Sequence, residues 1–354
     1  MTNQHNVAPG IPVTTDVSAA VPAAVPGVVP TVSILGCGGF GINIARAVRA
    51  AIGDIVTYHN FDTSDANVLT GEPLTIVAGG RGAGQVRSTL SKEIEKTLLA
   101  STADELYLSN INIVINSLGG GSGSVIGPLL ARTAVQRETR VIEVALADTA
   151  SEKYTENSLS TLQTLSAIAT NNDIYLPMML FSNDNMARTD ADQSIVSAVV
   201  WLVRLLTIPV REIDWSDRIN WLNASKTVGV PAGLRLLHVY ADVAGISDGQ
   251  PFKGEVWFQS AKTVYDSVLS IGVEGRDSVI RTVAGPKPLA RFFKQGTATA
   301  IKLAPMCGLI SGDPTPITEL IKKIQEIQRI YKATPTSSLA DVLGVASGSG
   351  DIIF

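Results

Sequence analysis

The sequence predicts an α/β fold: a Rossmann-like parallel sheet covered by helices, a long central helix and a smaller α+β C-terminal domain. Three observations lead to this prediction. Short apolar strands alternate with helical segments through residues 31–191, glycine-rich loops follow three of these strands, and one later helix is apolar on nearly every side. Continuous apolar strands separated by helices are typical of a parallel sheet that is buried on both faces.

The predicted sheet domain, residues 31–191, consists of alternating strands and helices. The strands are apolar runs bounded by glycines or polar turns, and they cover residues 31–35, 54–61, 74–78, 111–118, 140–146 and 174–181. The helices have apolar residues at helical spacing, and they cover residues 42–51, 85–100 and 125–136. Because ligands bind beyond the carboxyl ends of parallel strands, we expect the functional groups at that edge.

The predicted central helix covers residues 192–210 and has the sequence DQSIVSAVVWLVRLLTIP followed by Val210. A helix that is apolar all round is buried on every side, which suits a spine between two domains. The smaller domain is expected at residues 211–335, with strands at 235–243 and 298–307 and an amphipathic helix at 317–333. The composition also predicts a disordered N-terminal arm at residues 1–30 and a flexible C-terminal tail at residues 336–354.

Composition and charge exclude several classes of protein. The formal net charge of -4 gives no electrostatic reason to expect nucleic acid or an anionic membrane as a direct partner. Because Cys37 and Cys307 are the only cysteines, and only three histidines are present, neither a disulfide scaffold nor a cysteine or histidine metal site is favoured. The sequence shows no signal-peptide pattern and no membrane-length apolar helix, so we expect a cytoplasmic protein.

The first glycine loop lies in residues 31–43, TVSILGCGGFGIN, between a strand and a helix. It contains the G-x-G-x-x-G fingerprint of a dinucleotide-binding fold, in which backbone N–H groups approach phosphate oxygens. The residues that would do so are Gly36, Cys37, Gly38 and Gly39. A nicotinamide or flavin enzyme would also have an acidic residue after the second strand, and Asp62 fits that position. Taken alone, this loop predicts a Rossmann-type oxidoreductase.

Two further glycine loops change that interpretation. The loop after the fourth strand contains Gly119, Gly120, Gly121, Ser122, Gly123 and Ser124. The loop after the third strand, GRGAG at residues 80–84, contains Gly82, Ala83 and Gly84. Glycine runs are costly to order, whereas a nest of backbone N–H groups with two hydroxyls suits a terminal phosphate. Three such loops fit a triphosphate, and the pattern of Walker-type NTPases is absent.

Together the loops resemble the nucleotide-binding loops of the tubulin/FtsZ superfamily. GGGSGS resembles the GGGTG[ST]G signature with Ser122 for Thr, GCGGFGIN resembles the first loop, and GRGAG resembles the GxGAG loop that contacts the terminal phosphate. Residues 63–67, TSDAN, resemble the family's NTDAQ loop. The resemblance covers most of residues 31–217. It implies GTP or GDP as the bound nucleotide, with Mg²⁺ carried in by the triphosphate and no protein metal ligand named.

The resemblance also implies contacts for the ribose and the base. The separation of Glu156 from Asn183 matches that between the family's ribose-contacting Glu and its Asn-Asp pair, here Asn183-Asp184. Asp192 matches the acid that opens the central helix and accepts hydrogen bonds from guanine, although an Asp there would equally serve as a helix N-cap. By the same resemblance, Asn43 is expected to be a further guanine contact.

An acidic segment follows the central helix. Residues 212–217, EIDWSD, resemble the family's N-x-D-x-x-D loop, which reaches into the nucleotide site of the next subunit. By this resemblance Asp214 and Asp217 are the catalytic residues that orient or polarise the attacking water; the alternative is a solvated acidic turn. Three departures mark a divergent member with slow hydrolysis: Glu212 replaces the usual Asn, Val125 replaces the signature's last Gly, and Ser160 replaces an Arg.

The sequence therefore predicts a GTP-binding cytoskeletal GTPase that polymerises head-to-tail with copies of itself, as a divergent prokaryotic, plasmid or phage tubulin-like member. The terminal DIIF suggests that a small partner docks on the C-terminal tail. Two alternatives stay open. One is a Rossmann-type NAD- or FAD-dependent oxidoreductase, and the other is a tubulin homologue that binds nucleotide without polymerising.

Overall fold

The protein is described by a computed structural model. It covers residues 31–84, 87–183, 186–209, 214–227, 231–240, 252–256, 265–271, 281–282, 306–311 and 314–333. The predicted arm and tail lie outside the described residues, as do Asp184, Glu212 and the first eight residues of the strand expected at 298–307.

Ten strands of the described chain form one sheet, in the order β3-β2-β1-β4-β5-β6-β7-β10-β8-β9. Seven strands are mutually parallel: β1 (Val32–Cys37), β2 (Thr57–Asp62), β3 (Leu74–Ile76), β4 (Ile111–Ser117), β5 (Arg140–Ala147), β6 (Tyr175–Ser182) and β7 (Gly233–Tyr240). Three strands run antiparallel to their neighbours: β10 (Met306–Ser311), β8 (Tyr265–Ile271) and β9 (Arg281–Thr282). The predicted α/β fold with a Rossmann-like parallel sheet is confirmed.

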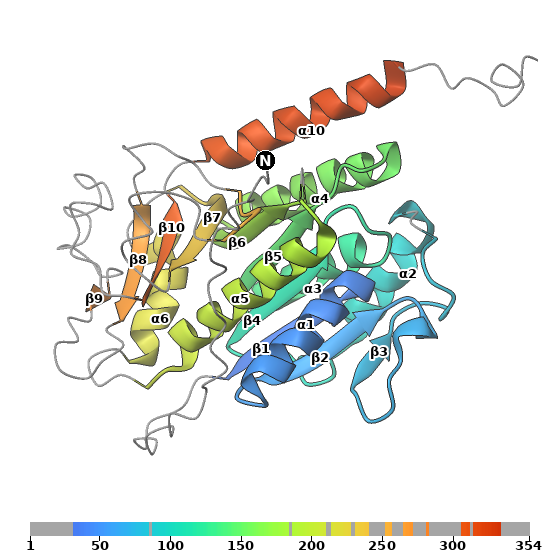
Figure 1. Cartoon of the computed structure of the whole chain (residues 1–354). Coiled ribbons are helices and arrows are strands. Elements are labelled where there is room, and N and C mark those ends of the chain that lie inside the picture. The colour runs from blue at the N-terminus through green and yellow to red at the C-terminus, as the bar shows by residue number, and fades with distance from the viewer. Residues whose placement is uncertain are drawn as a thin grey trace, which may run out of the picture.

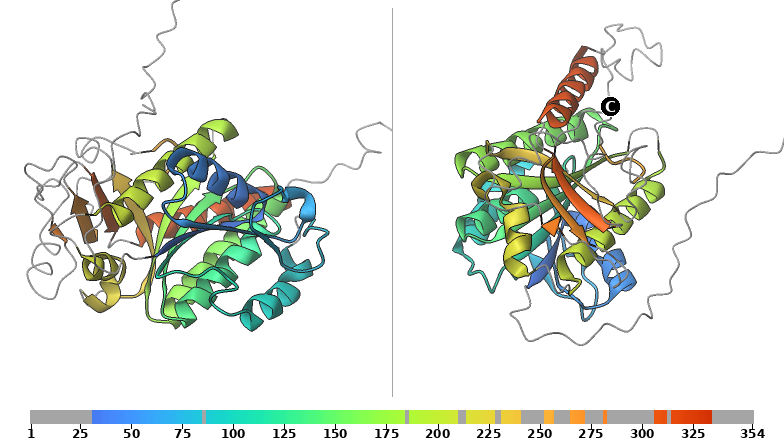
Figure 2. Two further views of the ribbon diagram at one scale, coloured as in Figure 1. Left: turned by 90° about the horizontal axis from the view of Figure 1, so that it is seen from below. Right: turned by 90° about the vertical axis from the view of Figure 1, so that its left-hand side faces the viewer.

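Helices cover both faces of the sheet (Figures 1 and 2). One face packs against α1 (Gly38–Ile52), α5 (Arg188–Thr207) and α6 (Trp215–Leu222). The opposite face packs against α2 (Arg87–Ala100), α3 (Gly123–Gln136) and α4 (Glu152–Asn171), with α10 (Thr315–Ala333) lying along α4. Two short elements, η1 (Asp65–Asn67) and α7 (Ala224–Thr227), complete the described helices. Each face therefore has its own apolar cluster.

The strand order creates a switch point between β1 and β4. The chain passes from β1 through α1 to β2 on one side, and from β4 through α3 to β5 on the other. Strand β1 pairs with both β2 and β4, so that Cys37 lies opposite Phe61 and Asn116. In open α/β sheets this arrangement leaves a crevice outside the carboxyl ends of the two strands.

The central helix begins earlier than the sequence pattern indicated. Helix α5 starts at Arg188, so Asp192 lies in its second turn, and Ala187 occupies the N-cap position without a side-chain hydrogen bond. The interpretation of Asp192 as an N-cap is therefore wrong. From Ser194 onward no residue of α5 is exposed, which agrees with the predicted spine of the molecule.

Helix α4 has no counterpart among the predicted helices. Its sequence is rich in Ser, Thr and Asn, whose side chains compete with the backbone for hydrogen bonds and lower helix propensity. In the structure Ser151 caps the helix by accepting from the Tyr154 N–H at 3.2 Å, and the buried Thr161 hydroxyl donates to the Leu118 carbonyl at 3.0 Å. Capping and tertiary contacts thus stabilise this helix where propensity does not.

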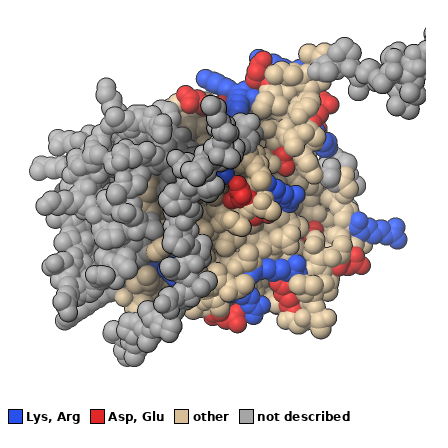
Figure 3. Space-filling model, viewed as in Figure 1, with Lys and Arg blue, Asp and Glu red and all other residues tan. Residues whose placement is uncertain are grey.

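The described surface shows no large single-sign patch on the face in Figure 3, where Lys and Arg side chains are interspersed with Asp and Glu. No described helix combines the length and the apolar character needed to cross a membrane. Strands β7 to β10 extend the same sheet as β1 to β6, and the domain boundaries given above stay predictions.

Candidate functional site

A cleft of about 250 Å³ opens at the carboxyl ends of β1 and β4, where the strand order predicts a ligand site. All three glycine loops contribute to its wall. The residues that line it are Cys37, Gly38, Gly39, Phe40, Asp62, Ser64, Asn67, Ala83, Gly84, Ser117, Gly120, Gly121, Ser122 and Gly123. Members of all three predicted glycine loops therefore lie around one cleft.

The first glycine loop is the end of β1 and the first turn of α1. Cys37 is the N-cap of α1 and makes no side-chain cap, and no acidic residue stands in the first turn. Gly38 has φ +68, and a Cβ there would lie 2.7 Å from the Gly123 backbone nitrogen. Only glycine allows the two loops to approach so closely. The N–H groups of this first turn are left available for an anion in the cleft.

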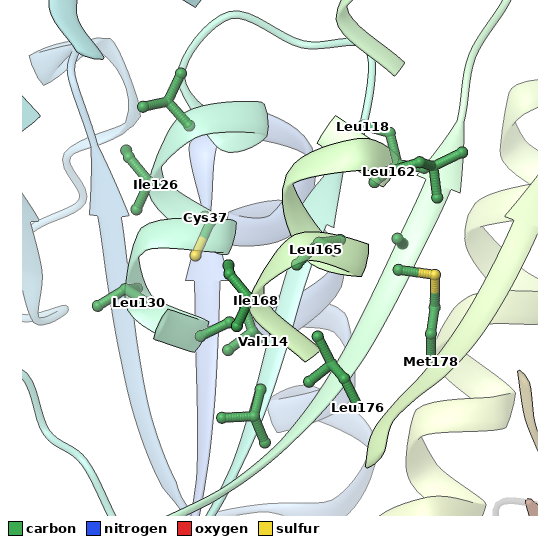
Figure 4. Packing of buried hydrophobic residues seen from close by; sticks show 14 of the residues in the cluster. Cys37, Val114, Leu118, Ile126, Leu130, Leu162, Leu165, Ile168, Leu176 and Met178 are labelled. Carbon is green, nitrogen blue, oxygen red and sulfur yellow. The ribbon is translucent and has the colours of Figure 1, made fainter. Parts of the chain in front are cut away.

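The Cys37 side chain points away from the cleft. Figure 4 shows it among the apolar side chains beneath α3 and α4. Its thiol is fully buried and contacts the Leu35 carbonyl at 3.6 Å. Burial, followed by the nearby Glu143 and Asp62 carboxyls, raises the pKa of this thiol well above its ordinary value. Cys37 is thus a packing residue that offers the cleft only its backbone.

In the loop between β4 and α3, some residues line the cleft and others are buried against the rest of the protein. Gly120, Gly121, Ser122 and Gly123 line the cleft. The Ser124 hydroxyl donates back to the Gly121 carbonyl at 3.2 Å. The buried Gly119 packs against α4, where the Asn157 side chain donates to its carbonyl at 3.0 Å. Neither Ser124 nor Gly119 faces the cleft; both hold the loop in place.

The segment after β2 joins the glycine loops at residues 80–84 and 119–124 to each other. The hydroxyls of Thr63 and Ser122 are hydrogen-bonded at 2.5 Å, and the Gly82 N–H donates to the Thr63 carbonyl at 2.7 Å. Asp62 accepts from the Thr63 N–H and from the Asn67 side chain, both at 2.7 Å. Because both carboxylate oxygens of Asp62 are used within its own loop, the structure does not favour a ribose-binding role for Asp62.

Ser64, Asn67, Phe40 and Ser117 line the cleft but were not among the predicted site residues. The first two belong to the TSDAN segment, whose resemblance to a family loop was the available signal. Phe40 lies inside the first glycine loop, and Ser117 ends β4, two residues before the loop that begins at Gly119.

The residues predicted for ribose and base surround the same edge of the sheet without lining the cleft. Asn43 is in the second turn of α1, Glu156 is in the second turn of α4, and Asn183 directly follows β6. Glu156 is exposed and pairs with Lys153 at 2.7 Å. Asp192 has one buried carboxylate oxygen, Oδ1, without a hydrogen-bond partner, and burial raises the pKa of this carboxyl.

The two predicted catalytic acids lie at the other end of the molecule. Asp214 is the N-cap of α6 and accepts from the Asp217 N–H at 3.0 Å, while Asp217 accepts from the Asp214 N–H at 3.1 Å. This capping box uses one oxygen of each carboxylate. Helix α5 spans about 30 Å between the nucleotide edge and this end, so the acids of one copy cannot reach its own cleft.

Comparison with solved structures places this architecture in a known fold. A protofilament of TubZ from bacteriophage PhiKZ superposes with a TM-score of 0.68 at 21% sequence identity, covering 85% of this chain and 90% of the other. The phage tubulin PhuZ with GDP gives a TM-score of 0.67 at 20% identity, covering 92% and 96%. The chain has the tubulin/FtsZ fold.

Sequence comparison agrees with this tubulin/FtsZ assignment. A phage tubulin-like protein of Pseudomonas phage 201phi2-1 is 30% identical over 198 residues, which are 54% of this chain and 61% of the relative. The chain thus matches about three fifths of that relative's length. No protein-family model matches the chain.

Proposed function

We propose that this chain binds GTP in the cleft, assembles head-to-tail with further copies of itself, and hydrolyses GTP at the contact between copies. The observation that carries the proposal is the separation of the site into two parts. The three glycine loops meet at one end of α5, and the acids Asp214 and Asp217 lie beyond its other end. A head-to-tail contact between copies would bring the two parts together, and contacts of this kind that do not close form filaments.

The cleft suits the phosphates of a nucleotide. Five of its lining residues are glycines at the starts of α1 and α3, and neither helix has an acidic residue in its first turn. Helix N-termini and glycine nests attract anions. Among the described residues no three His, Cys, Asp or Glu side chains gather as a metal site. Mg²⁺ bound with the triphosphate would keep phosphate and water ligands and neutralise charge there.

Hydrolysis would depend on a water held by the acids of the neighbouring copy. Phosphoryl transfer requires positioning and charge neutralisation more than covalent chemistry, and a carboxylate can orient a water in line with the γ-phosphate. Each acid keeps one oxygen free of the capping box. The relatives support this proposal: a protofilament and a GDP-bound phage tubulin share the fold.

The proposal predicts GTP-dependent assembly. In right-angle light scattering, the full chain with GTP and Mg²⁺ is expected to scatter above a critical concentration, and the same chain with ATP is not. Equilibrium binding of GTP, GDP, NAD and FAD is measured in parallel. Binding of NAD or FAD without GTP would favour the oxidoreductase, whereas GTP binding without scattering at any concentration would favour the non-polymerising homologue.

Base selectivity is expected to depend on Asp192. A buried carboxylate oxygen without a donor is costly unless a ligand supplies one, and guanine offers N1–H and the 2-amino group. The Asp192→Asn variant replaces one acceptor by a donor, so it should lower GTP affinity about 10- to 100-fold while leaving the melting temperature unchanged. Competition binding with GTP and ITP measures this, because ITP lacks the 2-amino group. Unchanged GTP affinity would remove Asp192 from the base site.

A further inference from the structure

One short segment connects two of the three glycine loops. Residues 62–67 hold the third glycine loop in chain order, residues 119–124, through the Thr63–Ser122 hydroxyl pair at 2.5 Å. They hold the second glycine loop, residues 80–84, through two backbone bonds. The Gly82 N–H donates to the Thr63 carbonyl at 2.7 Å, and the Asp65 N–H donates to the Gly80 carbonyl at 3.2 Å. The relative placement of these two loops therefore depends on where this segment lies.

The segment is fixed from outside by Arg46 on α1. The Arg46 Nη2 donates to the Asn67 carbonyl at 2.6 Å, and its Nε donates to Glu72 Oε2 at 2.7 Å. The Arg46 and Glu72 side chains are 23% and 14% exposed. Glu72 Oε1 also accepts from the Asn60 side chain on β2 at 3.0 Å. We call Arg46, Asn67 and Glu72 the Arg46 clamp.

The clamp reaches residues that line the cleft. Arg46 holds the backbone carbonyl of Asn67, and the Asn67 side chain donates to Asp62 at 2.7 Å. Both Asn67 and Asp62 are part of the cleft wall. A part-buried, charge-assisted bond of a planar guanidinium to two acceptors fixes direction as well as distance. Arg46 itself is not among the lining residues, so it can act on a ligand only through the segment that it holds.

We propose that Arg46 is a positioning residue that sets the affinity of the cleft for the terminal phosphate. This inference rests on the proposed GTP binding and adds Arg46 as a residue outside the cleft that affects nucleotide affinity. Loss of the clamp frees residues 62–67, and with them the second glycine loop, which resembles the loop that contacts the terminal phosphate. The first and third loops keep their own anchors in α1, β4 and α4. A triphosphate should therefore lose more affinity than a diphosphate.

The same helix provides a matched control. Arg49 lies one turn after Arg46 and donates through Nε to Asp54 Oδ1 at 2.7 Å, but these side chains are 40% and 70% exposed. Exposed ion pairs contribute little to stability, and neither residue lines the cleft. Arg49→Gln removes the same charge from the same helix without touching the segment.

The test compares binding of GTPγS and GDP by the full chain, at protein concentrations below those that scatter light. Arg46→Gln should weaken GTPγS binding about tenfold and GDP binding less than about threefold. Arg49→Gln should change neither. Arg46→Lys should recover only part of the loss, because an ammonium lacks the fork that spans both acceptors. Glu72→Gln keeps an acceptor oxygen but removes the charge. It should lower the ratio of GTPγS affinity to GDP affinity, as Arg46→Gln does, but by a smaller factor.

The outcomes separate this inference from the proposed function. If the unmodified chain binds neither nucleotide, the proposed function fails. If it binds GTPγS and Arg46→Gln retains the unmodified ratio of GTPγS to GDP affinity, the positioning role of Arg46 fails alone. An equal loss of affinity for GTPγS and GDP would also contradict the positioning role of Arg46, because general damage to the fold would weaken binding of both nucleotides alike. If Arg46→Gln does not fold, the ratio of GTPγS to GDP affinity is measured with Glu72→Gln. An unchanged ratio in that variant contradicts the positioning role of the clamp.

Discussion

The double variant Asp214→Asn/Asp217→Asn is expected to bind GTP and to assemble, but to hydrolyse GTP at least about a hundredfold more slowly than the unmodified chain. Asn is as good an N-cap as Asp, and its amide oxygen can accept the same backbone N–H bond. The capping box at the start of α6 can therefore be kept while both carboxylates are lost. Phosphate release per assembled subunit measures the effect, with sedimentation reporting assembly.

Asn substitution also separates catalysis from folding. Asp214→Ala would cost about 1 kcal/mol of cap stability and could lower activity for that reason alone. A control with the same change in net charge is Glu93→Gln/Glu319→Gln, two exposed acids on α2 and α10; it should hydrolyse at the unmodified rate. Hydrolysis by the Asn variant within threefold of the unmodified rate would contradict a catalytic role for these acids. Mixing it with unmodified chain should restore hydrolysis in proportion to the unmodified fraction, because each site uses its neighbour's acids.

The local parts of the site were predictable from the sequence. Glycine runs at the ends of apolar strands have few structural explanations, so three of them predicted both the sheet edge and a shared ligand. The structure brings Gly38, Ala83 and Gly120 to one cleft, although they are far apart in the chain. Parallel strands made this possible, because their carboxyl ends all meet at the same edge.

The parts that failed or were missed have weak local signals or depend on long-range contacts. The start of α5 was misplaced because residues 188–191, RTDA, carry no strong N-terminal signal other than Asp190 in the first turn. Helix α4 was missed because its capping and buried hydroxyl bonds, such as that of Thr161 to Leu118, compensate for weak propensity. The Arg46 clamp joins residues 21 and 26 positions apart, and no local pattern indicates which arginine finds an acceptor.

The core under the third glycine loop contains a carboxyl that the proposed chemistry does not use. Glu143 lies on β5, is fully buried, and accepts from the Asn116 side chain at 2.9 Å. Its Oε1 and the Asn116 Oδ1 are buried without hydrogen-bond partners. A Cβ on Gly127 of α3 would clash with the Asn116 amide, so α3 lies directly against this pair. Burial, only partly offset by the Asn116 bond, raises the pKa of Glu143 from 4.5 to about 8.

Protonation of Glu143 links stability to pH. Between pH 4.5 and about 8 the folded chain holds a proton that the unfolded chain has released, so this residue makes the free energy of unfolding fall as the pH rises. Glu143→Gln removes the linkage and keeps an acceptor for Asn116. The variant should be more stable than the unmodified chain by about 3 kcal/mol at pH 7, and by only about 1 kcal/mol at pH 5.

Urea unfolding at pH 5, 6, 7 and 8 measures this difference directly, since other titrating groups are shared by the two chains and cancel. The exposed Glu152→Gln on α4 provides the control and should change stability by less than about 0.5 kcal/mol at every pH. A constant difference between pH 5 and pH 8 would show that Glu143 is ionised in the folded state throughout. A destabilised Glu143→Gln variant at pH 7 would show that its carboxylate is held by interactions stronger than the single Asn116 bond, which the geometry around β5 and α3 does not provide.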